Sequence, residues 1–286
     1  MCEHDDLDEF TRRRELTRRQ FGAMALGAGL VAMLPRSSGA AETAGEDVEI
    51  KTPDGVADSY VVHPTKGKFP AVLIWPDIFG LRPAFRAMAT RLAESGYTVL
   101  VINPFYRNHK APTSPEHADF NDPPTRDALM ALRNSLTATT TVTDAKAFVT
   151  YLDGHPAVDV KRRMGTTGYC MGGPLVLRTA AARADRIGAA ATFHGGGLVT
   201  KDADSPHLLI PQTHAHYLIA IAANDDEREP DSKTVLRDTF ERSHLSAEVE
   251  VYAGTQHGWC PPDSPVYNRD QAEKAWDRLL VLLKNL

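Results

Sequence analysis

The amino-acid sequence predicts an α/β fold with a mostly parallel central sheet and helices on both faces. Continuous apolar runs at residues 71–75 and 98–102 are typical of strands buried on both sides in a parallel sheet. Between them, residues 81–95 repeat apolar side chains at helical spacing and stop at Gly96, a favourable residue for ending a helix. Strand, helix and strand at this spacing predict a βαβ unit.

The other elements are expected to extend this sheet. A strand from Val48, a turn at residues 52–55 and a strand at 59–63 precede the βαβ unit. Residues 104–125, rich in Pro, His, Asn and Asp, predict a long loop. Residues 125–152 predict a helix that is broken in the threonine run 137–143. The remaining expected elements are strands at 163–169, 188–193, 217–222 and 247–252, and helices from about 172, at 232–243 and at 268–286.

Composition and charge limit the kinds of partner. The chain has 286 residues, of which 42% are hydrophobic and 24% charged, as in an ordinary globular protein. A formal charge of -5 and the lack of a long basic run argue against nucleic acid, so a small molecule is the expected partner. The three cysteines, at positions 2, 170 and 260, form neither a disulfide framework nor a zinc motif. No metal and no cofactor are expected.

Residues 1–40 are predicted to be an export signal, and residues 41–286 a single domain. Residues 17–21, TRRQF, form a twin-arginine motif, followed by an apolar run at 22–34 and small residues at 37–41. The apolar run is too short, and its glycines and alanines make it too weakly hydrophobic, to be a stable membrane anchor. The sequence therefore predicts export of the folded chain by the twin-arginine machinery to the periplasm, with cleavage after Ala40 or Ala41. An amphipathic surface helix with a chance arginine pair is the alternative.

Residues 168–172, GYCMG, have the G-x-nucleophile-x-G spacing of a nucleophile elbow, with Cys170 in the nucleophile position. A strand that turns this sharply into a helix leaves no room for side chains two residues on either side of the nucleophile, so glycine is needed there. The helix N-terminus that follows favours a thiolate. By itself the pattern also fits a small buried cysteine.

A thiol nucleophile needs a base, and the base needs an orienting acid. In the order nucleophile, acid, histidine, His257 follows the strand at 247–252 and a glycine turn, and Asp225 follows the strand at 217–222. Asp226 is the second choice for the acid. His194 also ends a strand, but a hydrogen-bonded core or loop histidine is the preferred interpretation.

With these residues assembled, the chain resembles the dienelactone hydrolase family of α/β-hydrolases. The matching segments are WPDIFG at 75–80, GY at 96–97, YR at 106–107, GYCMGG at 168–173, ND at 224–225 and GTQHG at 254–258. The resemblance implies the α/β-hydrolase fold and hydrolysis of a small ester or lactone through a thioester. It implies Cys170 as nucleophile and Asp225 and His257 as its partners. It also implies the backbone N–H groups of Met171 and Ile78 as the oxyanion hole.

Two positions depart from the family pattern. The family usually has a glutamate that holds the resting thiol, whereas this chain has the shorter Asp77. Well-studied members have an arginine four residues after the histidine to bind the substrate carboxylate, where this chain has Pro261. Asp77, Tyr106 and Arg126 are the candidates for substrate binding or thiol gating.

Two other classes of function fit the sequence. A thiol redox protein would form a reversible disulfide between Cys170 and Cys260, although no C-x-x-C motif is present. A protein that binds its ligand without catalysis could also have kept the hydrolase fold.

We expect the double substitution Arg18→Lys and Arg19→Lys to retain the protein in the cytoplasm, because the paired arginines, rather than positive charge alone, are the export address. Cell fractionation measures this. The purified variant should keep its esterase activity. An unchanged periplasmic pool would show that the segment is not read as a twin-arginine signal.

Overall fold

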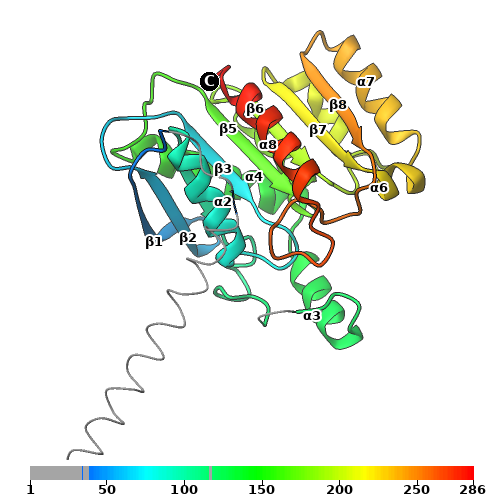
Figure 1. Cartoon of the computed structure of the whole chain (residues 1–286), viewed down its shortest axis with the longest axis horizontal. Helices are drawn as coiled ribbons and strands as arrows, with labels where there is room; N and C mark the ends of the chain where they lie inside the picture. The colour runs from blue at the N-terminus through cyan, green and yellow to red at the C-terminus, as the bar shows by residue number, and fades with distance from the viewer. Residues whose placement is uncertain (1–33, 35–38, 116–117) are drawn as a thin grey trace, which may run out of the picture.

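The computed structural model describes residue 34 and residues 39–115 and 118–286. The twin-arginine motif at 17–21 lies outside the described residues. Figure 1 shows the arrangement of the elements. The strands are β1 (Thr43–Thr52), β2 (Gly55–Pro64), β3 (Ala71–Trp75), β4 (Thr98–Ile102), β5 (Met164–Tyr169), β6 (Ile187–Phe193), β7 (His216–Ala222) and β8 (Ala247–Tyr252). The helices are α2 (Pro83–Glu94), α3 (Pro123–Arg133), α4 (Ala138–Gly154), α5 (Gly172–Ala182), η1 (Pro206–Gln212), α6 (Ala223–Arg228), α7 (Ser232–Arg242) and α8 (Arg269–Leu283).

The strands form one 8-stranded sheet in the order β1-β2-β4-β3-β5-β6-β7-β8. Strands β3 to β8 pair in parallel, whereas β1 and β2 form an antiparallel hairpin at one edge. Every residue of β3, β4, β5 and β6 is buried, as expected for strands covered on both faces. The predicted mostly parallel α/β fold is confirmed.

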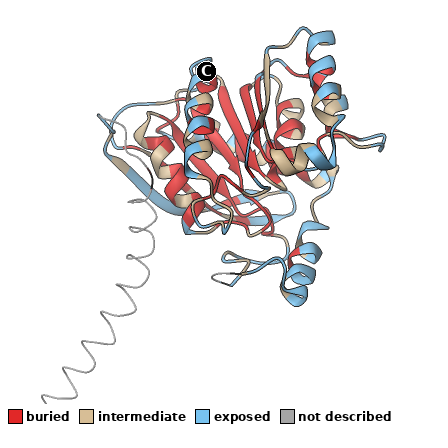
Figure 2. Cartoon of the chain, turned by 45° about the vertical axis from the view of Figure 1, so that its right-hand side comes forward, coloured by how far each residue is buried: buried red, intermediate tan, exposed pale blue. Residues whose placement is uncertain are grey.

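Helices cover both faces of the sheet. Phe85 of α2 and Trp276 of α8 pack in one hydrophobic layer, and Phe148 of α4, Val176 of α5 and Phe240 of α7 pack in the other. Figure 1 shows α2 and α8 in front of the sheet, and in Figure 2 the strands between the helix layers are almost entirely buried. Leu34, which lies within the predicted signal, is also buried in the layer of α2 and α8.

Several element boundaries differ from the predictions. The threonine run does not break a helix. Instead, the break lies at residues 134–137, and Thr137 starts α4 by forming a reciprocal capping box with Thr140. The predicted long loop ends earlier, because Asp122 caps α3 through the Thr125 N–H and Pro123 fits the first helical turn. Helix α3 stands away from the body of the protein and is largely exposed (Figure 2). The short helix α6 and the 3-10 helix η1 were not predicted.

The turn from β5 into α5 depends on backbone contacts at Gly168 and Gly172. A Cβ added at Gly168 would lie 2.2 Å from the carbonyl oxygen of Gly172, and one at Gly172 would lie 2.3 Å from that of Trp75. Contacts this short with backbone atoms cannot be relieved by moving a side chain. Glycine at both positions therefore allows α5 to begin directly against the end of β3.

We expect Gly172→Ala to lower the free energy of unfolding by about 2–4 kcal/mol, because the new methyl group must displace backbone atoms. Urea unfolding measures the change. Gly196→Ala is the matched control, since an added Cβ there meets no atom within 4 Å. The control should stay within about 0.5 kcal/mol of the parent. Equal stability of the two variants would contradict the packing argument.

Candidate active site

The residues that could perform chemistry follow the carboxyl ends of neighbouring parallel strands. Cys170 comes directly after β5 and His194 after β6. Asp225 follows β7 in α6, and His257 follows β8. Because these strands are adjacent in the sheet, their carboxyl ends meet at one edge, where ligands bind in open α/β sheets.

Cys170 is held in a strained turn. Its φ angle is 52°, in the left-handed region that residues with a side chain rarely adopt. The Cys170 N–H donates to the Phe193 carbonyl at 3.0 Å, and the Cys170 carbonyl accepts from the Gly173 N–H at 3.0 Å. The thiol is free and partly exposed. Strand β6 and the first turn of α5 thus hold the turn, with the thiol at the carboxyl edge of the sheet.

The two predicted oxyanion donors lie in the segments that meet at this turn. Met171 directly precedes α5, and Ile78 lies just beyond β3, whose Trp75 carbonyl packs against Gly172. Among the described residues, no acceptor takes the backbone N–H of Met171 or of Ile78. These two donors are therefore available to a substrate oxygen.

The imidazole of His257 joins the thiol to a carboxylate. Its Nε2 lies 3.0 Å from Cys170 Sγ, and its Nδ1 lies 2.7 Å from Asp225 Oδ2. The His257 N–H donates to Asn224 Oδ1 at 2.8 Å, and Arg228 donates to Asp225 Oδ1 at 2.9 Å. The neighbouring Asp226 is instead paired with Lys233 at 2.6 Å. Of the two aspartates, Asp225 is the one placed to orient the imidazole.

This arrangement favours the imidazolium form of His257. Burial alone lowers the pKa of the imidazole, but the hydrogen bonds to Asp225 and Cys170 and the charges of these two groups outweigh burial and raise it to about 10. The Cys170 thiol is thus next to an imidazole that keeps its proton, and a thiol nucleophile needs a partner of this kind.

His194 packs against the catalytic candidate His257. The two rings are 5.1 Å apart between centroids, in an edge-to-face arrangement, and His194 is 1% exposed. Neither ring nitrogen of His194 has a hydrogen-bond partner among the described residues, which differs from the hydrogen-bonded histidine expected from the sequence. Burial, with His257 as a second cause, lowers the pKa of His194 well below its ordinary value. This ring is a neutral wall of the site.

Asp77 is engaged by an arginine. Its Oδ1 and Oδ2 accept from Arg82 at 2.6 and 2.9 Å, and Oδ1 also accepts from the Phe79 N–H at 3.0 Å. Among the described residues, no hydrogen bond joins this carboxylate to the Cys170 thiol. The thiol's partner in this structure is His257.

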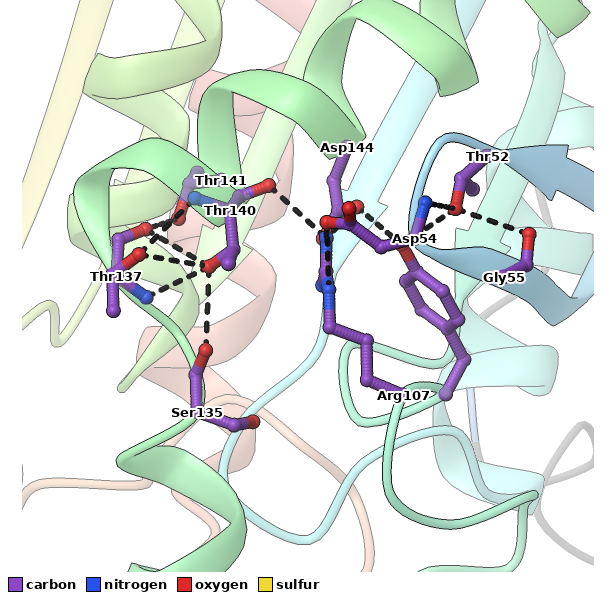
Figure 3. Close-up of polar contacts among 10 residues, drawn as sticks. Thr52, Asp54, Gly55, Arg107, Ser135, Thr137, Thr140, Thr141 and Asp144 are labelled. Carbon is purple, nitrogen blue, oxygen red and sulfur yellow. Dashed lines mark hydrogen bonds and ion pairs between the residues drawn. The ribbon is translucent and has the colours of Figure 1, made fainter.

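A polar cluster that includes Arg107, Asp144 and Asp54 lies between the β1–β2 turn and α4 (Figure 3). The Tyr106 hydroxyl joins it by donating to Asp144 Oδ1 at 2.7 Å and also bonds Thr52. Arg107 binds both oxygens of the fully buried Asp144 and reaches Asp54 at 2.6 Å. Both side chains of the YR segment thus connect the hairpin to α4, with their polar groups already paired.

The remaining candidate side chains are dispersed. Arg126 lies on α3 with its side chain 44% exposed, 3.7 Å from Asp127. Cys260 is a free, buried thiol whose pKa burial raises well above its ordinary value. In the described part of the chain, no cluster of three or more His, Cys, Asp or Glu could hold a metal ion. Among the same residues, no helix has both the length and the apolar character needed to cross a membrane.

The model of the dienelactone hydrolase family matches residues 57–286. The chain belongs to the dienelactone hydrolase family. It is thus a hydrolase of the carboxymethylenebutenolidase type.

Named relatives agree with this membership. One from Bradyrhizobium sp., a "Probable 2-oxo-3-(5-oxofuran-2-ylidene)propanoate lactonase", is 27% identical over 251 residues, which cover 86% of this chain and 96% of the relative. A carboxymethylenebutenolidase of Rhodococcus opacus is 31% identical over 121 residues, 42% of each chain. A dienelactone hydrolase-like promiscuous phosphotriesterase from metagenomic libraries shares the fold, with a TM-score of 0.70 at 20% identity, covering 85% of this chain and 98% of its own.

Sequence reasoning missed three residues that support the site of this dienelactone hydrolase family member. Asn224 was matched to the family without a role, yet it fixes the His257 backbone. Arg82 and Asp263, which lie far apart in the chain, form an ion pair next to the segment of Asp77. An arginine at the start of a helix, two residues beyond the DIFG segment, was the available signal for Arg82.

We expect iodoacetamide to label Cys170 at a rate that changes less than about threefold between pH 7 and 9, because His257 keeps its proton over this range. An ordinary thiol, with a pKa near 8.5, gains about 20-fold in thiolate over the same interval. Mass spectrometry of the labelled peptide gives the rates.

Asp77→Ala should leave this labelling within about twofold, since Arg82 and not the thiol binds the carboxylate. Strong acceleration in Asp77→Ala at neutral pH would mean that Asp77 gates the thiol. An ordinary thiol titration in the parent protein would contradict the paired state of Cys170 and His257.

Proposed function

We propose that the protein is an exported hydrolase of small, uncharged esters or lactones that uses Cys170, His257 and Asp225 as a catalytic triad. The observation that carries the proposal is the line of contacts from thiol to imidazole to carboxylate, at 3.0 and 2.7 Å. The names of two relatives, a lactonase and a carboxymethylenebutenolidase, favour lactones among the possible substrates. The export part rests on the twin-arginine motif at residues 17–21.

In the first half-reaction, the Cys170 thiolate attacks the substrate carbonyl and a sulfur–carbon bond forms. The carbonyl oxygen takes up the electron pair as an oxyanion, and the N–H groups of Met171 and Ile78 bind it, at about 3 kcal/mol for each donor. When the intermediate collapses, the bond to the leaving oxygen breaks. His257 gives its proton to that oxygen, and a thioester remains on Cys170.

In the second half-reaction, water replaces the thiolate on the acyl group. His257, now neutral and oriented by Asp225, removes a proton from the water, which attacks the thioester. The acid leaves, and the Cys170 thiolate and the His257 imidazolium are restored. Thiolates attack readily but also leave readily, so activated esters and enol lactones suit this site better than amides.

The charges around the site favour a substrate without a carboxylate. The position where relatives carry an arginine is Pro261, and Arg126 lies exposed on α3. Arg82 is already bound by Asp77 and Asp263. Neither position 261 nor the paired Arg82 therefore offers a cation to an anionic substrate, and burying an unpaired carboxylate costs several kcal/mol.

The redox alternative has less support in the structure. Cys260 is 7% exposed and lies in an apolar layer, where burial raises its pKa and suppresses the thiolate that disulfide exchange needs. The non-catalytic alternative is decided by turnover alone.

A panel of p-nitrophenyl esters and lactones tests the proposal. We expect turnover by the parent protein and a loss of about 10³-fold or more in Cys170→Ala. Cys260→Ala, a buried thiol outside the triad, is the matched control and should retain activity. Between esters with the same leaving group, p-nitrophenyl acetate should be a better substrate than the p-nitrophenyl monoester of succinate, which carries a free carboxylate.

Three results would contradict parts of this proposal. Absence of turnover across the panel would favour the binding protein. Loss of activity in Cys260→Ala would favour a role for the second thiol. A preference for the succinate monoester would contradict the argument from charge.

A further inference from the structure

Arg82 binds two carboxylates that come from opposite ends of the domain sequence. Its Nη1 and Nη2 donate to Asp77 at 2.6 and 2.9 Å, and its Nε and Nη2 donate to Asp263 at 2.7 and 3.0 Å. A further contact from Nη1 to the Gly80 carbonyl, at 3.4 Å, accounts for the fifth N–H. Every donor of the guanidinium is thus used.

The surroundings of Arg82 make this arrangement rigid. Its side chain is 14% exposed, and that of Asp77 is 9% exposed. The guanidinium carbon lies 4.8 Å from the centre of the Phe85 ring and 5.5 Å from that of Phe79. A lysine has one nitrogen and no planar fork, so it could not hold two carboxylates in the same geometry.

The first carboxylate controls the segment that carries Ile78. Asp77 accepts from the Phe79 N–H through its side chain and from the Gly80 N–H through its carbonyl. Thr113 and Ser114, from the long loop, donate to the Phe79 carbonyl at 3.2 Å each. Arg82 therefore holds the turn formed by residues 77–80 through Asp77. Ile78, whose N–H is the candidate oxyanion donor, is the residue directly after Asp77.

The second carboxylate belongs to the segment that carries His257. Asp263 lies in the loop between β8 and α8, six residues after His257. The Asn268 N–H closes this loop by donating to the Trp259 carbonyl at 3.1 Å. A single guanidinium thus connects the loop after β3 to the loop after β8. The strands β3 and β8 are not neighbours in the sheet.

We propose that Arg82 is a positioning residue that fixes the oxyanion donor Ile78 relative to the triad by clamping the loop of residues 76–80 to the loop of residues 253–268. This inference rests on the proposed function, because it takes Ile78 as an oxyanion donor. The clamp does not touch the reacting atoms. It acts by holding the Ile78 N–H where the tetrahedral intermediate forms.

Two reactions of the Cys170 thiol, ester acylation and alkylation, distinguish this positioning role from a general disturbance of the structure around the thiol. Ester acylation develops an oxyanion and needs the Ile78 N–H in place. Alkylation by iodoacetamide forms a sulfur–carbon bond while the carbon–iodine bond breaks and iodide leaves, so no oxyanion develops at a carbonyl. A displaced donor lowers the first rate and leaves the second unchanged.

Arg82→Lys and Asp263→Asn are the test variants. In each we expect kcat for p-nitrophenyl acetate to fall about tenfold or more, as for loss or displacement of one oxyanion donor. KM should stay within about threefold and the iodoacetamide rate within about twofold. The ratio of the two rates is the decisive quantity, because it compares a reaction that needs the oxyanion donors with one that does not, at the same thiol of the folded protein.

Arg186→Lys is the matched control. Arg186 lies directly before β6, its side chain is 16% exposed, and it pairs with Asp153 of α4 at 2.8 Å. It is therefore a paired, mostly buried arginine that connects two elements at the amino ends of the strands, whereas the loops in question follow the carboxyl ends of β3 and β8. This variant should leave the ratio of acylation to alkylation unchanged.

Amide hydrogen exchange supplies a measurement that needs no turnover. Residues 76–80 and 253–268 should exchange faster together in Arg82→Lys and in Asp263→Asn, but not in Arg186→Lys. Faster exchange in only one loop, or in neither, would overturn the clamp. An equal loss of acylation and alkylation in Arg82→Lys would overturn its role at the oxyanion site. If the parent protein hydrolyses no ester, the proposed function fails, and hydrogen exchange alone decides whether Arg82 joins the loops.

Discussion

Backbone atoms at the turn after β5 come so close together that no side chain fits between them, and the rest of the site depends on this contact. Gly168 faces the carbonyl of Gly172, and Gly172 faces the carbonyl of Trp75. The contact brings the end of β3 against the first turn of α5, so the Ile78 and Met171 segments meet beside Cys170. In the same turn Cys170 has a φ of 52°, a strain that the surrounding sheet must hold.

The chemistry then follows from how loops from the other half of the sheet meet this turn. Strands β7 and β8 are neighbours, so the loop that carries Asp225 lies beside the loop that carries His257. Thr255 connects the two loops by accepting from the Ala223 N–H. A carboxylate on one side of the imidazole and a thiol on the other together outweigh the effect of burial, and His257 stays charged.

The carboxylate at position 77 is bound by an arginine. In this chain both oxygens of Asp77 face Arg82, and the same arginine neutralises Asp263. A buried guanidinium flanked by two carboxylates is fully paired, and removing one partner of such a group is costly. The two carboxylates thus occupy Arg82, so this guanidinium is not available to an anionic substrate, which is why we favour uncharged esters and lactones.

Features that local sequence determines were predictable from the chain alone. The apolar runs of β3 and β4 identified buried strands, because strands covered on both faces are rich in apolar residues along their whole length. The glycines around Cys170 identified the sharp turn, and the positions of Asp225 and His257 after strands placed them at the same edge. The start of α4 at Thr137 was also local information, since the capping box is a short-range pattern, although the threonine run was interpreted as a break.

Only the tertiary structure decided which polar groups pair. Arg82 and Asp263 are 181 residues apart, and Tyr106 and Asp144 are 38 apart, so neither contact leaves a periodic or spacing signal in the sequence. Burial of His194 against His257 depends on the packing of two loops. The sequence by itself determined the sharp turn at Cys170 and the order in which the candidate residues follow the strands, because steric limits on a turn act between near neighbours. The fold decided the partner of Asp77, because ion pairing depends on distance in space, which the chain reaches only when the sheet has formed.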